Sequence, residues 1–161
     1  MILPARKINR LAAYDYSQGG VYFVTICTQD RHQILSDIVG DGVPVPKPVG
    51  EIAEEYLHKI PEKYPSVSID QYVIMPDHIH ILLDICSGGT GNPSPTIGKV
   101  IGWYKYHVTK CANLIFDCAG KRIFQRSYYD HVVRNQADYD ETWQYIENNP
   151  RQWLLDKSFR Q

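Results

Sequence analysis

Two histidines separated by one residue, His78 and His80, form the sharpest chemical pattern in the chain. The apolar segment around them predicts a β-strand, in which residues i and i+2 project from the same face. Two imidazoles held this way could bind one divalent ion, while Ile79 between them points into the core. So short a pattern also fits histidines without a metal. Asp77 and Asp84 are either further metal partners or simply a turn residue and a strand-end residue.

A tyrosine could supply the second chemical group, because a phenol can attack phosphorus when a metal ion withdraws charge from the phosphate. Tyr145, in the segment WQYIENNP, precedes Asn149 by four residues, so the two share one face of a predicted helix. A tyrosine on an amphipathic helix is more often a packing residue, and the chain has 12 tyrosines. The pattern therefore leaves other candidates open, namely Tyr104, Tyr106, Tyr128, Tyr129 and Tyr139.

Basic and aromatic residues alternate in WYKYHVTK, between Trp103 and Lys110. Such surfaces stack nucleic-acid bases and neutralise phosphates, although a helix with one packed face and one solvated basic face has the same pattern. The formal net charge of −1 argues mildly against nucleic-acid binding, but residues 99–126 carry six bases and one acid. A local basic face is enough to contact phosphate. The expected contacts are Lys99, Trp103, Lys105, Lys110, Arg126 and Arg134.

Hydrophobic periodicity predicts the elements that must position these groups. The predicted strands are Gly20–Thr28, Val67–Met75, His78–Ile85 and Phe124–Val133. The predicted helices are Val49–Lys63, a second that Thr96 caps and that runs to about Asn113, and a third that Asn135 caps and that ends near Asn148, before Pro150. The segments Gly40–Pro48 and Ser87–Pro95 are predicted as loops. This order predicts an α+β, ferredoxin-like βαββαβ sandwich with an antiparallel sheet and an added C-terminal helix.

Length and composition favour one globular domain over residues 1–161, with 43% hydrophobic and 22% charged residues. No segment is apolar enough to predict a membrane span or a signal peptide, so a cytoplasmic protein without a membrane partner is expected. The four cysteines form no CxxC pair and are predicted to be buried, reduced thiols.

Three segments, taken in order, resemble the small IS200-like transposases that use a His-hydrophobic-His pair and one tyrosine. They are RLAAYDYSQGGVYFVTICTQDR, YVIMPDHIHILL and FQRSYYDHVVRNQADYDETWQYIENNP. The most similar branch is that of the bacterial REP-associated tyrosine transposases. The resemblance extends over roughly Arg10 to Asp156, or about residues 10–156 as a domain core.

The resemblance implies that His78 and His80 bind the metal, that Tyr145 is the nucleophile, and that Asn149 helps to hold the ion. The implied ion is Mg²⁺ or Mn²⁺, and because such hard cations prefer oxygen, Asn149 would complement the two imidazoles. The implied substrate is single-stranded DNA beside a REP-like or inverted-repeat hairpin, cleaved and rejoined through a 5′-phosphotyrosine. The resemblance leaves a monomer and a homodimer both open.

Other functions also stay open at this point. A domesticated protein could bind a DNA hairpin without cutting it, but the intact set of two histidines, a tyrosine and an asparagine argues against lost cleavage. Replication or mobilisation nickases use the same chemistry, but they are generally larger and often carry a third histidine. A small-molecule metalloenzyme with a histidine pair would leave the basic, aromatic helix unexplained.

Overall fold

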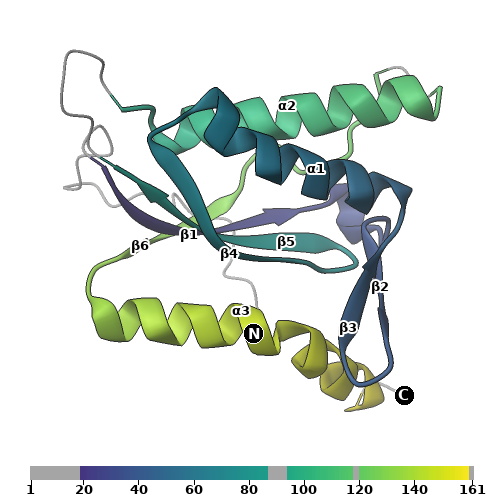
Figure 1. Ribbon diagram of the computed structural model, residues 1–161. Helices are drawn as coiled ribbons and strands as arrows, with labels where there is room; N and C mark the ends of the chain where they lie inside the picture. The colour runs from purple at the N-terminus through teal and green to yellow at the C-terminus, as the bar shows by residue number, and fades with distance from the viewer. Residues whose placement is uncertain (1–18, 87–93, 118–119, 160–161) are drawn as a thin grey trace.

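The computed structural model describes residues 19–86, 94–117 and 120–159. Its central feature is a four-stranded antiparallel sheet in the order β4-β5-β1-β6, with α1 and α2 on one face and α3 on the other (Figure 1). The strands of this sheet are β1 (Gly20–Cys27), β4 (Val67–Ile74), β5 (His78–Ile85) and β6 (Tyr129–Val133). The helices are α1 (Pro48–Lys63), α2 (Ile97–Ile115) and α3 (Gln136–Phe159). The ferredoxin-like βαββαβ prediction with an added C-terminal helix is confirmed.

Strands β1 and β5 pair at the centre of the sheet, and their register sorts side chains between its two faces. Ile79 and Ile81 are fully buried in the main core, which the sheet forms with α1 and α2. Leu82 lies on the opposite face, in a smaller cluster that includes Ile146 of α3. Because side chains alternate along a strand, His78 and His80 face α3.

Both helix caps predicted from the sequence are present. The Thr96 hydroxyl accepts a hydrogen bond from the Lys99 backbone N–H at 3.2 Å, and the Asn135 side chain accepts one from the Asp138 N–H at 2.8 Å. Each cap satisfies a backbone donor that has no partner inside its helix. The starts of α2 and α3 were therefore readable from local sequence.

The segment 40–48 is not a loop throughout, as its glycines and prolines had predicted. It holds the turn and the second strand of a hairpin formed by β2 (Ser36–Val39) and β3 (Val43–Pro46), with positive φ at Gly40 and Gly42 in the turn. A two-stranded hairpin leaves alternate backbone N–H groups unpaired, so prolines can occupy those positions without breaking the ladder. A Cβ on Gly42 would lie 3.0 Å from the backbone of Arg151, so this glycine lets the hairpin approach α3 closely.

The third helix is longer than predicted, because it does not end before Pro150 but continues to Phe159. A proline inside a helix costs about 3 kcal/mol, since it removes one hydrogen bond and crowds the preceding turn. The continuation brings Trp153 into the cluster around Leu82 and Ile146, and this burial offsets the cost. Strand β6 is shorter than predicted, and Phe124 makes only an isolated bridge with Thr28.

Two predictions lie wholly or largely outside the described residues. They are the loop Ser87–Pro95, of which only Ser94 and Pro95 are described, and the thiol of Cys118. Cys27, Cys86 and Cys111 are free thiols, but only Cys27 is buried. Within the described ranges, no helix combines the length and apolar character needed to cross a membrane.

Two glycines in helices give a test of this packing. A Cβ at Gly50 would overlap the carbonyl oxygen of Leu35, whereas a Cβ at Gly102 of α2 would meet nothing within 4 Å. We expect Gly50→Ala to lower the free energy of unfolding by about 1–3 kcal/mol because the chain must shift. The matched change Gly102→Ala should raise it by up to about 1 kcal/mol. Urea unfolding measures both, and equal effects would contradict the close approach at Gly50.

Candidate active site

The two histidines lie side by side at the start of β5, facing α3. Their ring centroids are 4.6 Å apart, and His78 and His80 are only 7% and 1% exposed. Ile79 between them points into the opposite core, as the alternation predicted. Burial on a central strand gives both imidazoles a fixed position, which a metal site needs.

Both ring nitrogens of His78 lie close to a side-chain oxygen. Its Nδ1 lies 2.6 Å from Oδ1 of Asp77, and its Nε2 lies 3.3 Å from Oδ1 of Asn149. Burial opposes ionisation of Asp77, but the hydrogen bond and charge of His78 and the charge of Arg31 outweigh it and keep the pKa of this carboxyl below its ordinary value. Asp77 therefore acts as a carboxylate that accepts the Nδ1–H of His78.

His80 has only one of its two nitrogens engaged. Nδ1 lies 2.8 Å from the Thr25 hydroxyl, while the buried Nε2 has no hydrogen-bond partner among the residues described. Burial, with a smaller effect of His78, keeps the pKa of His80 well below its ordinary value, so its ring is neutral. When Nδ1 donates to Thr25, Nε2 presents a buried lone pair without a donor, which is costly unless something fills the position.

Tyr145 of α3 packs against the same rings. Its ring centroid lies 5.3 Å from that of His80 and 5.9 Å from that of Phe23, and Phe23 in turn stacks on His80 at 5.1 Å. Burial raises the pKa of the Tyr145 phenol, although a hydrogen bond with Asn149 acts in the opposite direction. The four residues expected from the sequence, two from β5 and two from α3, thus form one cluster.

The alternative tyrosines are placed differently. Tyr104 is fully buried in the core between the sheet and α1, where its hydroxyl donates to the Ala53 carbonyl. Tyr139 shares α3 with Tyr145, but its hydroxyl donates to Asp70, and burial together with this bond raises its pKa to about 12. Tyr106 is exposed on α2, on the far side of the sheet.

The cluster has the donor set of a small cation site. Nε2 of His78 and Oδ1 of Asn149 both offer lone pairs when His78 is neutral, and the unpartnered Nε2 of His80 belongs to the neighbouring ring. Within the described ranges, no group of three or more His, Cys, Asp or Glu side chains could hold a metal ion, and the further oxygen in this cluster is the amide oxygen of Asn149. Asp84 does not join it, since four residues along a strand separate it from His80 by about 13 Å.

Sequence reasoning missed several neighbours of this cluster. Phe23, Thr25 and Cys27 share one face of β1, and the register places Thr25 opposite His80 and Cys27 opposite His78. Their alternate positions on one predicted strand indicated that they share a face of the sheet. Nothing local indicated that this strand would pair with the strand of the two histidines. The ring of Trp153 lies 6.2 Å from that of His78. This contact was not predicted, because the helix was expected to end before Pro150.

Four of the residues expected to contact nucleic acid lie on α2, on the opposite face of the sheet from the histidine cluster (Figure 1), namely Lys99, Trp103, Lys105 and Lys110. Arg126 and Arg134 lie before and after β6. Trp103 is half-buried against the core, with ring contacts to Tyr56, Tyr64 and His107. The Lys105 ammonium donates to the backbone carbonyls of Gln125 and Arg126. The exposed residues of the predicted set are Lys99, Lys110, Arg126 and Arg134.

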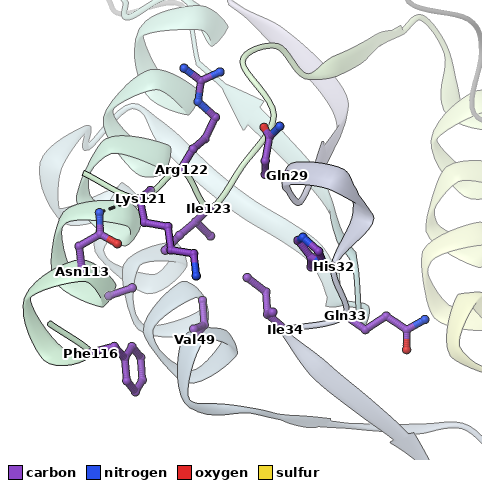
Figure 2. A pocket seen from close by; sticks show the side chains of 11 residues that line it. Gln29, His32, Gln33, Ile34, Val49, Asn113, Phe116, Lys121, Arg122 and Ile123 are labelled. Carbon is purple, nitrogen blue, oxygen red and sulfur yellow. Dashed lines mark hydrogen bonds between the residues drawn. The ribbon is translucent and has the colours of Figure 1, made fainter. Parts of the chain in front are cut away.

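Three adjoining hollows meet near the end of α2, and Arg122 lines all of them. The largest has a volume of about 470 Å³, and in Figure 2 Lys121 reaches toward its middle, with Phe116 and Val49 along one side. Among the described residues, one acid, Asp30, lines these hollows. The cations that line them are Lys105, Lys110, Lys121, Arg122 and Arg126. This basic trough is a surface suited to a polyanion.

Comparison with known proteins relates this arrangement to one family. Residues 17–149 match the model of the IS200-like transposases. An uncharacterised protein of Haemophilus influenzae is 30% identical over 96% of this chain and 93% of its own length. A second protein of that organism, whose name assigns it provisionally to the REP-associated tyrosine transposases, is 28% identical over 84% of this chain and 73% of its own.

Two solved structures share the fold. A REP-associated tyrosine transposase bound to a REP hairpin superposes with a TM-score of 0.58 at 21% identity, covering 88% of this chain and 72% of its own. A Deinococcus radiodurans protein, named provisionally as a transposase, gives a TM-score of 0.52 at 20% identity, covering 88% of this chain and 97% of its own. With the family model matching most of the residues described, the chain belongs to the IS200-like transposase family.

Proposed function

We propose that this protein cleaves and rejoins single-stranded DNA beside a hairpin, with Tyr145 as the nucleophile and with His78, His80 and Asn149 as ligands of a divalent ion. The observation that supports it best is the buried Nε2 of His80, which has no partner among the described residues and sits 5.3 Å, ring to ring, from Tyr145. A buried lone pair beside a phenol suits a phosphoryl-transfer site better than a packing role.

The proposed reaction follows from where these side chains lie. Mg²⁺ or Mn²⁺, when bound, would polarise the scissile phosphate and stabilise the leaving oxygen. The Tyr145 oxygen attacks phosphorus, the bond to the 3′-oxygen breaks, and the phenol proton ends on that oxygen or in solvent. The products are a 5′-phosphotyrosine and a free 3′-hydroxyl. Attack by another 3′-hydroxyl on the ester reverses the step and rejoins DNA.

The proposed partner is a DNA hairpin, because the structurally similar transposase is bound to a REP hairpin. The basic trough around Arg122 offers this chain a place for the phosphates. The sheet separates this trough from the histidine face. In our proposal the trough therefore binds the folded DNA, and the histidine face acts on the flanking single strand. A hairpin-binding protein that does not cut is the alternative, and it predicts binding without metal-dependent cleavage.

Replacing the nucleophile is the first test of this proposal. We expect Tyr145→Phe to abolish the covalent adduct and to slow cleavage of a hairpin-flanked oligonucleotide with Mn²⁺ by more than about 1,000-fold. Tyr139→Phe is the matched control on the same helix and should cut at close to the wild-type rate. Denaturing gels read both adduct and cleavage. An adduct that persists in the Tyr145 variant would refute the assignment.

The metal ligands are tested by binding, independently of DNA. We expect His80→Ala to weaken Mn²⁺ binding more than tenfold in calorimetry, because one of three donors is lost. Manganese should also raise the melting temperature of the wild-type protein and not of this variant, since a ligand of the native state stabilises it. His131→Ala removes an exposed histidine and serves as control. Equal affinities in all three proteins would rule out this ion site.

The basic trough is tested by the salt dependence of hairpin binding. Arg122→Ala should raise the dissociation constant for a DNA hairpin and reduce the slope of log K against log salt by about one, as expected for one lost phosphate contact. Lys59→Ala, on α1, removes a surface cation that is paired with Glu55 and should change neither quantity. Fluorescence anisotropy in EDTA measures binding alone. An unchanged slope for Arg122→Ala would place the DNA elsewhere.

A further inference from the structure

Arg31 forms a bidentate contact with Asp77, the carboxylate that accepts a hydrogen bond from His78. Its Nε lies 3.1 Å from Oδ2 and its Nη2 lies 3.2 Å from Oδ1 of Asp77. The same Oδ1 accepts the 2.6 Å hydrogen bond from Nδ1 of His78. Both carboxylate oxygens are therefore engaged, and the carboxylate plane cannot turn without breaking a charged hydrogen bond.

The third arm of the guanidinium is also fixed. Nη1 of Arg31 donates to the buried sulfur of Cys27 at 2.9 Å, and Cys27 is the register partner of His78 on the neighbouring strand. The side chain of Arg31 is only about one-third exposed. Fork-shaped geometry is specific to arginine, because an ammonium is a point charge that cannot present three donors in one plane.

The backbone around Arg31 adopts a conformation that ordinary residues avoid. Asp30 and Arg31 have φ values of 55° and 56°, in the left-handed region. The turn is tied to the strand junction, since both the backbone N–H and the hydroxyl of Thr28 donate to the Asp77 carbonyl, at 3.0 and 3.1 Å. Such strain persists only where surrounding contacts impose it, and here the result is that Arg31 meets Asp77.

We propose that Arg31 is a positioning residue for metal binding: by clamping Asp77 it keeps the proton of His78 on Nδ1 and leaves Nε2 as a metal ligand. The consequence appears at the other side of the ring, where Nε2 of His78 faces Oδ1 of Asn149 at 3.3 Å. When Nδ1 carries the proton that Asp77 accepts, Nε2 presents a lone pair toward Oδ1 of Asn149, and a cation between these two acceptors would satisfy both. This inference rests on the proposed function, because it assigns Arg31 to the same ion site.

The test compares Arg31→Lys, which keeps the charge, with Arg31→Ala, and uses Lys59→Ala as the surface control. The first readout needs no metal: long-range ¹H–¹⁵N spectra report which nitrogen of His78 carries the proton. We expect Nδ1–H in the wild-type and control proteins, and a mixture of tautomers in both Arg31 variants. The second readout is calorimetric Mn²⁺ affinity, which should fall tenfold or more in both Arg31 variants.

Thermal unfolding and hairpin binding in EDTA show whether each variant is folded. Arg31→Lys is the deciding protein if the alanine variant is unfolded. Wild-type tautomer and affinity in Arg31→Lys would overturn the positioning role, and so would a wild-type chain that binds no Mn²⁺. A wild-type chain that binds Mn²⁺ through an Arg31-dependent His78 but never cuts DNA would overturn the proposed function and leave the positioning role standing. Normal DNA cleavage together with an Mn²⁺ affinity that does not depend on Arg31 would overturn the positioning role and leave the proposed function standing.

Discussion

The hydrogen-bonded ladder between β1 and β5 decides which side chains can meet in this protein. Its register puts Thr25 beside His80 and Cys27 beside His78, and it sends Ile79 to the opposite core. A slip of one residue would turn both histidines into the packed layer beneath α1 and α2. The large apolar core on that side therefore stabilises the register on which the candidate site depends.

Closure of the site depends on a second constraint, the crossing of α3 over the free face of the sheet. The apolar cluster around Leu82 and Ile146 is small, so the helix uses further contacts to stay in place. Trp153 extends this cluster beyond Pro150, and the hairpin of β2 and β3 approaches the same end of the helix at Gly42. These contacts bring Tyr145 and Asn149 over the histidines.

The sheet also separates two kinds of chemistry. The α3 face holds the buried histidines, whereas the described residues that line the basic trough near the end of α2 include five cations and one acid. A formal net charge of −1 is thus compatible with a strongly basic surface. The turn at Asp30 and Arg31 lies between the two, because Asp30 lines the trough and Arg31 contacts Asp77. The turn thus links the edge of the trough to His78.

Several features were determined by the sequence itself, because their physical causes are local. Alternation along a strand placed His78 and His80 on one face, the four-residue helical spacing joined Tyr145 to Asn149, and side-chain caps marked the starts of two helices. The order of elements predicted the fold. Choosing Tyr145 among 12 tyrosines already needed a family resemblance, since no local property distinguishes it.

Only the tertiary structure decided the remaining features, because they depend on contacts between residues far apart in the chain. The hairpin at residues 36–46 and the helix beyond Pro150 form against local propensity, because packing against other elements offsets the cost. Nothing in the segment around Arg31 predicts its contact with Asp77, because Asp77 lies 46 residues later in the chain. Local chemistry was thus enough to name the reacting groups, and long-range packing was needed to orient them.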